Sequence, residues 1–161
     1  MFSGPAERLT EDVANIRYIK DSSANWEQAL KLIHHHSDVI STFIGWDSYI
    51  YSGLVEGAAG MVAGAANVLP AEIVSVSKLI ADGDLHGARA EWARLYPVID
   101  AMISEPFIQA VKTGLELRGV PVGSPRRPLA DTDPDARERI KEALTTLSGG
   151  GALSGVRGAV R

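Results

Sequence analysis

Short apolar runs and amphipathic segments alternate along residues 1–69. Three runs, at 15–20, 38–44 and 60–63, are short and bounded by polar or glycine positions, a pattern that predicts strands. Amphipathic segments with apolar residues at helical spacing follow the first two runs. Because strands that alternate with helices form βαβ units, the pattern predicts an α/β fold with a parallel sheet.

The helical segments carry typical starting residues. Asn25, with Gln28 three positions later, has the signature of a capping box, and residues 48–56 predict a second, shorter helix. No strand is predicted beyond Asn67, where four amphipathic runs follow. These runs begin at Pro70, Asp84, Pro106 and Asp133, and they predict helices as far as residue 147. Residues 148–161 are rich in glycine without a period, and we expect a flexible tail there.

Lys20 lies where the first predicted strand meets a polar loop. Ile16, Tyr18 and Lys20 fall at period two, so they share one face of an extended segment, with the lysine nearest the carboxyl end. If such a lysine lies in a pocket that excludes water, desolvation disfavours the ammonium and lowers the pKa. The neutral amine can then attack a carbonyl carbon to form a Schiff base. The alternative is a solvated lysine that closes the strand.

Four segments, in chain order, resemble one enzyme family. Residues 19–23 (Ile-Lys-Asp-Ser-Ser) resemble the Schiff-base lysine segment of the dihydrodipicolinate synthase and N-acetylneuraminate lyase family, which are pyruvate-dependent aldolases on a TIM barrel. Residues 45–47 resemble its Gly-x-Asp, residues 60–68 its glycine-rich last strand ending in Ala-Asn, and residues 121–129 its Gly-x-x-Arg-x-Pro-Leu stretch. The resemblance runs from about residue 9 to 147, and it covers the carboxyl-terminal half of the family.

The resemblance implies a partial TIM barrel followed by a carboxyl-terminal helical region. Residues 1–69 would form about the last three βα units, 70–147 the final barrel helix and the helical region, and 148–161 the tail. A whole barrel takes roughly 250 residues, so a chain of 161 is expected to lack the first five strands, as a split gene, a truncation or a fragment. Because three strands expose two edges, we expect a homo-oligomer or a complementing amino-terminal half.

The resemblance also implies a reaction and a site. Lys20 would condense with the ketone of pyruvate or a related 2-keto acid, and the imine, acting as electron sink without a cofactor, would let the neighbouring carbon add to an aldehyde. The positions implied to bind substrate are Gly45, Asp47, Val62, Gly64 and Asn67.

Several positions keep a structural alternative. Asp47 could instead cap the helix from Ser48, and Asn67 could be a buried amide that braces a loop. Tyr18 stands where the family usually has a small residue. The tyrosine proton shuttle and the carboxylate-binding loop of the family belong to its amino-terminal half, so the alternative function is a non-catalytic half-barrel that needs a partner chain.

Composition narrows the remaining classes. A net charge of −4 and a pI near 5.5 argue against a nucleic-acid binder. The chain has no cysteine, which excludes disulfides and cysteine-ligated metals. His34, His35 and His36 are consecutive and point about 100° apart on a helix, so we expect no metal site there. No apolar stretch is long enough for a membrane span, and we expect a cytoplasmic protein.

Overall fold

Three short parallel strands form one sheet in the order β1-β2-β3. The computed structural model describes residues 5–149, except for the side chains of residues 5–7 and 11. The strands are β1 (Tyr18–Asp21), β2 (Ser41–Ile44) and β3 (Gly60–Met61). All three predicted strands are confirmed, but each is shorter than its apolar run. Helix α1 (Pro5–Asp12) precedes the sheet.

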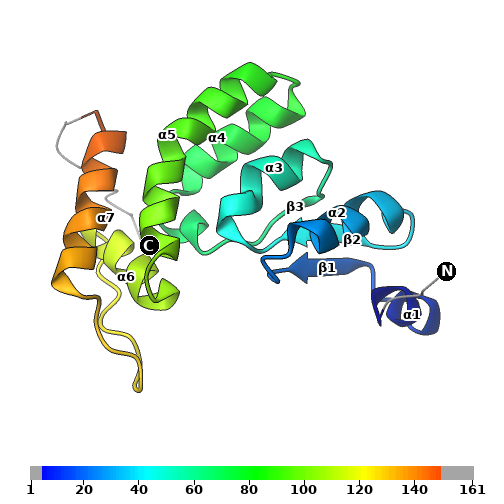
Figure 1. Ribbon diagram of the computed structural model, residues 1–161, viewed down its shortest axis with the longest axis horizontal. Helices are drawn as coiled ribbons and strands as arrows, with labels where there is room; N and C mark the ends of the chain where they lie inside the picture. The colour runs from blue at the N-terminus through cyan, green and yellow to red at the C-terminus, as the bar shows by residue number, and fades with distance from the viewer. Residues whose placement is uncertain (1–4, 150–161) are drawn as a thin grey trace, which may run out of the picture.

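The register separates the two faces of the sheet. Lys20 pairs with Phe43, and Phe43 pairs with Gly60, so these three positions share one face. The neighbouring positions Asp21 and Ile44 lie on the other face, which helices α2 (Trp26–His35) and α3 (Ile50–Val55) cover (Figure 1). The face that carries Lys20 has no such helix among the described residues.

The first helix of the sheet region begins as the sequence predicts. Asn25 Oδ1 accepts a hydrogen bond from the backbone N–H of Gln28 at 3.1 Å. The second half of the capping box is missing, because the side chain of Gln28 donates to Asp21 Oδ1 at 3.4 Å. The helix predicted over 48–56 is also different. It is a 3-10 turn, η1 (Asp47–Tyr49), followed by α3, which ends at Val55.

Four helices build the second part of the molecule. They are α4 (Pro70–Ala81), α5 (Leu85–Ile103), α6 (Phe107–Leu117) and α7 (Pro134–Leu147), and a 3-10 turn, η2 (Ala65–Asn67), leads into them from β3. The predicted starting residues are confirmed. Asp84 and Asp133 accept hydrogen bonds from the first turns of α5 and α7, and Pro70 opens α4.

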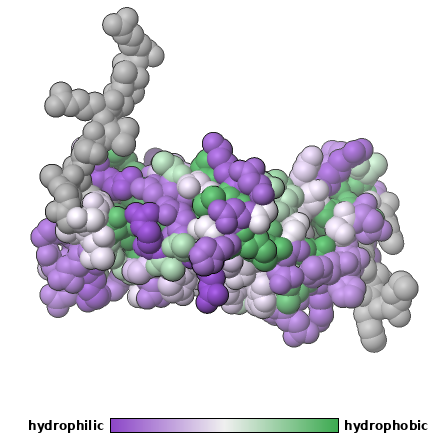
Figure 2. Space-filling view, turned by 90° about the horizontal axis from the view of Figure 1, so that it is seen from above, coloured by the Kyte–Doolittle hydropathy of each residue, from purple (hydrophilic) through white to green (hydrophobic). Residues whose placement is uncertain are grey.

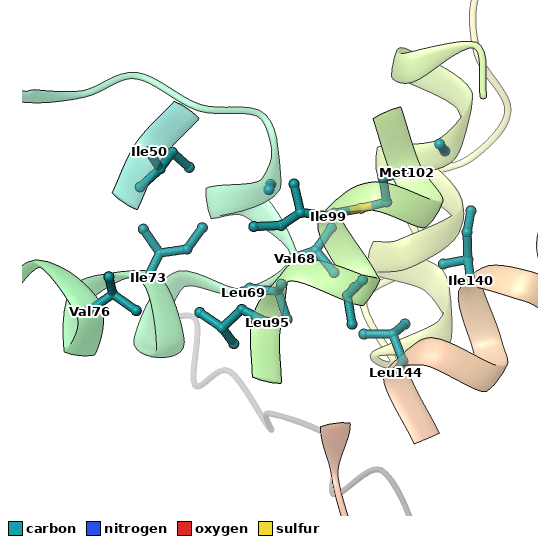
Figure 3. Close-up of a cluster of buried hydrophobic side chains, with 13 residues drawn as sticks. Ile50, Val68, Leu69, Ile73, Val76, Leu95, Ile99, Met102, Ile140 and Leu144 are labelled. Atoms are coloured by element: carbon teal, nitrogen blue, oxygen red, sulfur yellow. The ribbon is translucent and has the colours of Figure 1, made fainter. Parts of the chain in front are cut away.

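The main hydrophobic core lies among these helices. Its largest fully buried side chains come from α3 to α5 and from α7, and they lie close together in Figure 3. Among them are Ile50, Leu69, Ile73, Leu95, Ile99, Met102, Ile140 and Leu144. Most of these residues lie on the apolar faces of the amphipathic helices, so the helical pattern of the sequence accounts for the core. Seen from above, the surface carries separate apolar patches between hydrophilic residues (Figure 2).

Two further features bear on the predicted organisation. In the described part of the chain, no helix is long and apolar enough to cross a membrane. The predicted tail begins at Ser148, whose backbone N–H still donates to Leu144 O at 3.1 Å and so closes α7. The rest of the tail, from residue 150, lies outside the described residues.

Candidate functional site

Lys20 lies on the open face of the sheet, one residue before β1 ends. Its neighbours on that face are Tyr18, which is 68% exposed, and Phe43, which contacts the ring of Tyr18 edge-on with 6.0 Å between ring centroids. A shallow hollow of about 350 Å³ is lined by Tyr18, Ile19, Lys20, Phe43 and Val62. Lys20 is exposed, so the described residues do not enclose its amine in a pocket that excludes water.

Gly45 lets the lysine side chain cross the end of the neighbouring strand. A β-carbon added at Gly45 would lie 2.5 Å from Cε and 2.9 Å from Cγ of Lys20, and it would also collide with Oγ of Ser22. The backbone N–H of Gly45 donates to Asp21 O at 2.8 Å, which holds the two strand ends together. The absence of a side chain at Gly45 therefore sets the path of the Lys20 side chain.

A second hollow joins the strand ends to the helical region. It has a volume of about 260 Å³ and is lined by Lys20, Ser22, Gly45, Trp46, Asp47, Ile103 and Phe107. Ile103 is the last residue of α5, and Phe107 is the first of α6. Sequence reasoning missed both residues, because no local pattern links these helix ends to the sheet.

Asp47 is buried and faces the turn after β3. Its Oδ1 accepts a hydrogen bond from the backbone N–H of Ala65 at 2.6 Å, and the N–H of Gly64 also contributes. The structure contradicts the alternative that Asp47 caps the helix from Ser48, since neither η1 nor α3 has a side-chain cap. Burial raises the pKa of Asp47, whereas the backbone N–H groups and the charge of Lys20 oppose that rise. The carboxylate ties the end of β2 to the turn at η2.

We expect this buried carboxylate to give the protein a pH-dependent stability. The folded pKa of Asp47 lies above its ordinary value of about 3.9. Between the ordinary value and the folded pKa, the folded protein binds more protons than the unfolded chain. The free energy of unfolding should therefore fall as the pH rises through this range. Asp47→Asn keeps a carbonyl oxygen for the Ala65 N–H and should remove this slope. Asp47→Ala leaves that buried N–H unpaired and should lower the free energy of unfolding by about 1–3 kcal/mol.

Urea unfolding of the wild type and both variants between about pH 4 and pH 7 measures these effects. A wild-type slope that persists in Asp47→Asn would assign the pH dependence to another group.

The three remaining predicted positions lie along the segment after β3. Val62 is 52% exposed, and its backbone N–H donates to Ile44 O at 2.8 Å. Gly64 lies beneath Phe107, because a β-carbon there would collide with the phenyl ring. Asn67 is exposed rather than buried, and its Nδ2 donates to Gly64 O at 2.9 Å. The structural alternative for Asn67, a brace for this loop, agrees with that hydrogen bond.

Two other polar groups lie near the sheet, His34 on α2 and Asp21 at the end of β1. His34 pairs through Nε2 with Glu56 at 2.9 Å, and no group of three or more potential metal ligands occurs within residues 5–149. Asp21, which the sequence did not single out, is buried, and its Oδ1 accepts from the backbone N–H of Ser23 at 2.9 Å. Asp21 thus shapes the loop that follows Lys20.

Known proteins match this chain over most of its length. The 4-hydroxy-tetrahydrodipicolinate synthase of Chlorobium phaeobacteroides is 34% identical over 140 residues, which are 87% of this chain and 47% of that protein. The synthase of Thermomicrobium roseum is 35% identical over 141 residues, 88% of this chain and 46% of that protein. The chain therefore spans about half the length of the curated relatives it matches.

Solved structures agree with these relatives. The 4-hydroxy-tetrahydrodipicolinate synthase of Methylacidiphilum fumariolicum SolV superposes with a TM-score of 0.82 at 28% identity, over 88% of this chain and 47% of that one. DHDPS from Cyanidioschyzon merolae gives a TM-score of 0.81 at 26% identity, over 89% and 48%. The three-stranded parallel sheet and its helices fit a partial TIM barrel. A model described as the dihydrodipicolinate synthetase family matches residues 5–147. The chain therefore belongs to the dihydrodipicolinate synthetase family.

Proposed function

We propose that Lys20 forms a Schiff base with pyruvate or a related 2-keto acid, as part of a class I aldolase or lyase site. The observation that carries the proposal is the position of Lys20. The lysine lies at the carboxyl end of a parallel strand, on the open face of the sheet, and it borders a hollow with Gly45 and Asp47. Ligand sites of parallel α/β proteins lie at the carboxyl ends of the strands.

The bonds formed and broken balance with the amine, the two substrates and water. An acid–base group must also take up and return the protons, and in the family that group, a tyrosine, belongs to the amino-terminal half. The neutral amine attacks the ketone carbon, a C–N bond forms, and the ketone oxygen leaves as water to give an iminium ion. Loss of a proton from the next carbon gives an enamine, whose carbon bonds to the carbon of an aldehyde while the aldehyde oxygen takes up a proton. Hydrolysis of the imine then frees Lys20. In the reverse direction the same steps cleave the carbon–carbon bond.

The other positions would shape this site rather than react. Gly45 leaves room for the lysine side chain, Val62 lines the hollow on the open face, and Gly64 leaves room for the ring of Phe107. Asp47 and Asn67 hold the turn at η2 in place. We also propose a cytoplasmic location. In addition, we propose that the chain assembles as a homo-oligomer or with a complementing amino-terminal half, because β1 and β3 are both edge strands in the described sheet.

Trapping by reduction tests the proposal. The protein is incubated with pyruvate, reduced with borohydride and digested, and the peptide that contains Lys20 is examined by mass spectrometry. We expect an adduct on Lys20 that disappears in Lys20→Ala and remains in the matched control Lys31→Ala, which removes an exposed lysine from α2. A folded protein without an adduct on Lys20 would contradict the proposal.

The second candidate is a non-catalytic half-barrel that requires a partner chain. The observation that favours it is the exposure of Lys20 and Tyr18, which lie uncovered on the open face. An unreactive Lys20 in a folded protein, together with a defined complex that forms only when a complementing amino-terminal half is added, would favour this function.

A further inference from the structure

Apolar side chains line the hollow beside Lys20. Trp46 lies two residues after the end of β2 and is 38% exposed, and Ile103 and Phe107 approach from the junction of α5 and α6. A tryptophan and a phenylalanine that line one hollow offer large apolar surfaces, against which aromatic and branched groups pack favourably. A ligand bound to Lys20 would therefore meet hydrocarbon on this side.

Phe107 is held in this position by its own contacts. The ring lies over Gly64, where a side chain of any size would displace it, and Val111 on the next turn of α6 lies 3.6 Å from the same point. The glycine thus makes room for the phenyl ring at the wall of the hollow. The wall is therefore formed by Trp46 after β2, Ile103 at the end of α5 and Phe107 at the start of α6.

The polar groups that line the hollow offer few hydrogen-bonding or charged partners to a polar substituent of the ligand. The carboxylate of Asp47 is buried and bonded to the Ala65 N–H, and Ser22 contributes one hydroxyl. Among the described lining residues, Lys20 is the only cation. Because Lys20 is consumed in the imine, no second cation in the hollow would balance a further carboxylate, which costs free energy when it is left unpaired.

We propose that this site takes 2-keto acids, or aldehydes that add to pyruvate, whose distal group is apolar, aromatic or branched, and that Trp46, Ile103 and Phe107 bind that group. The inference rests on the proposed imine at Lys20. In an aldol adduct of pyruvate, the aldehyde carbon becomes C4 of the keto acid, so the group carried on C4 is the one that enters the hollow. Phe107 is then a residue that determines specificity.

Three keto acids that differ only at C4 separate the proposal from its alternatives. They are 2-oxobutanoate, 2-oxo-4-phenylbutanoate, which carries a phenyl group there, and 2-oxoglutarate, which carries a carboxylate. Each is titrated in the borohydride reaction, and the concentration that half-saturates the Lys20 adduct is measured. We expect a half-saturating concentration roughly 10-fold lower for the phenyl compound than for 2-oxobutanoate, because a hydrophobic pocket discriminates by about that factor. The value for 2-oxoglutarate should not be lower than that for 2-oxobutanoate.

Variants identify the wall. Phe107→Ala should abolish the preference for the phenyl compound, so that its half-saturating concentration becomes about equal to that of 2-oxobutanoate in the same variant. The matched control Ile108→Ala, which removes a side chain that is 56% exposed and outside the hollow, should keep the preference. If Phe107→Ala does not fold, Trp46→Gln tests the same wall from the segment that follows β2. A preference that survives in the folded wall variants would overturn the assignment.

A measurement without imine chemistry distinguishes the two proposals. Saturation-transfer NMR with 4-phenylbutanoate, which has no ketone, should give a signal that Phe107→Ala removes and Ile108→Ala retains. If that signal appears but no keto acid is trapped, the apolar site stands and the proposed function fails. If all three keto acids are trapped equally and the NMR signal is absent, the proposed function stands and the apolar site is overturned. Failure of both measurements overturns both.

Discussion

Gly45→Ala is expected to slow formation of the pyruvate adduct on Lys20 by roughly 100-fold while the protein remains folded. The added methyl group would lie 2.5 Å from Cε and 2.9 Å from Cγ of Lys20, so the lysine side chain must leave its path across the end of β2. A shift of about 1 Å in a reacting group can cost roughly 100-fold in rate. The atoms displaced belong to flexible side chains, so the free energy of unfolding should change little.

The rate is measured by quenching the pyruvate reaction with borohydride at successive times and quantifying the Lys20 peptide. Gly60→Ala is the matched control. It adds a methyl group on β3, at the same register level as Lys20, where the nearest atom of the Phe43 ring would lie 2.9 Å away. Equal losses in both variants would mean that distortion of the sheet, rather than the contact with Lys20, limits the reaction.

Ile99→Ala is expected to lower the free energy of unfolding by about 2–5 kcal/mol. Ile99 lies near the carboxyl end of α5 and is fully buried, and Figure 3 shows it in the same cluster as Val68 and Met102. The substitution removes apolar atoms from the contact of α5 with its neighbours and leaves a cavity that close-packed helices fill only in part. Ile99→Val, which removes one methylene group, should cost only about 0.5–1.5 kcal/mol.

Urea unfolding followed by far-ultraviolet circular dichroism measures both variants. Asp100→Ala, at the next and exposed position of α5, is the control and should lie within about 0.5 kcal/mol of wild type. A loss below about 1 kcal/mol for Ile99→Ala would mean that α5 is not packed into one cooperative core with α4 and α7.

The helices could be predicted from the sequence because their ends are set by local chemistry. Asn25, Asp84 and Asp133 each accept a backbone N–H within their own first turn, so the signal and the structure lie in the same few residues. The strand limits could not be predicted as well. Hydrophobic alternation continues before Tyr18, but the ladder requires a partner, and β1 pairs with β2 only from Tyr18 onward.

In the candidate site too, some residues could be predicted from the sequence and others could not. Lys20 and Gly45 were predicted because each lies beside a strand end that the sequence marks. The partner of Asp47 was missed, since the Ala65 N–H reaches it across a later turn. Phe107 and Ile103 were also missed, because their place beside Lys20 depends on how α5 and α6 pack against the end of the sheet.

The buried side chains of the main core come from α3, from η2 and the two residues after it, and from α4 to α7, and none of them comes from a described strand. In β1 only Asp21 is buried. Local opening of a protein costs least where few apolar contacts are lost. Opening of β1, the strand that carries Lys20, therefore loses little of the core. A carbonyl ligand bound covalently to Lys20, as proposed above, would then also stabilise β1 against this local opening.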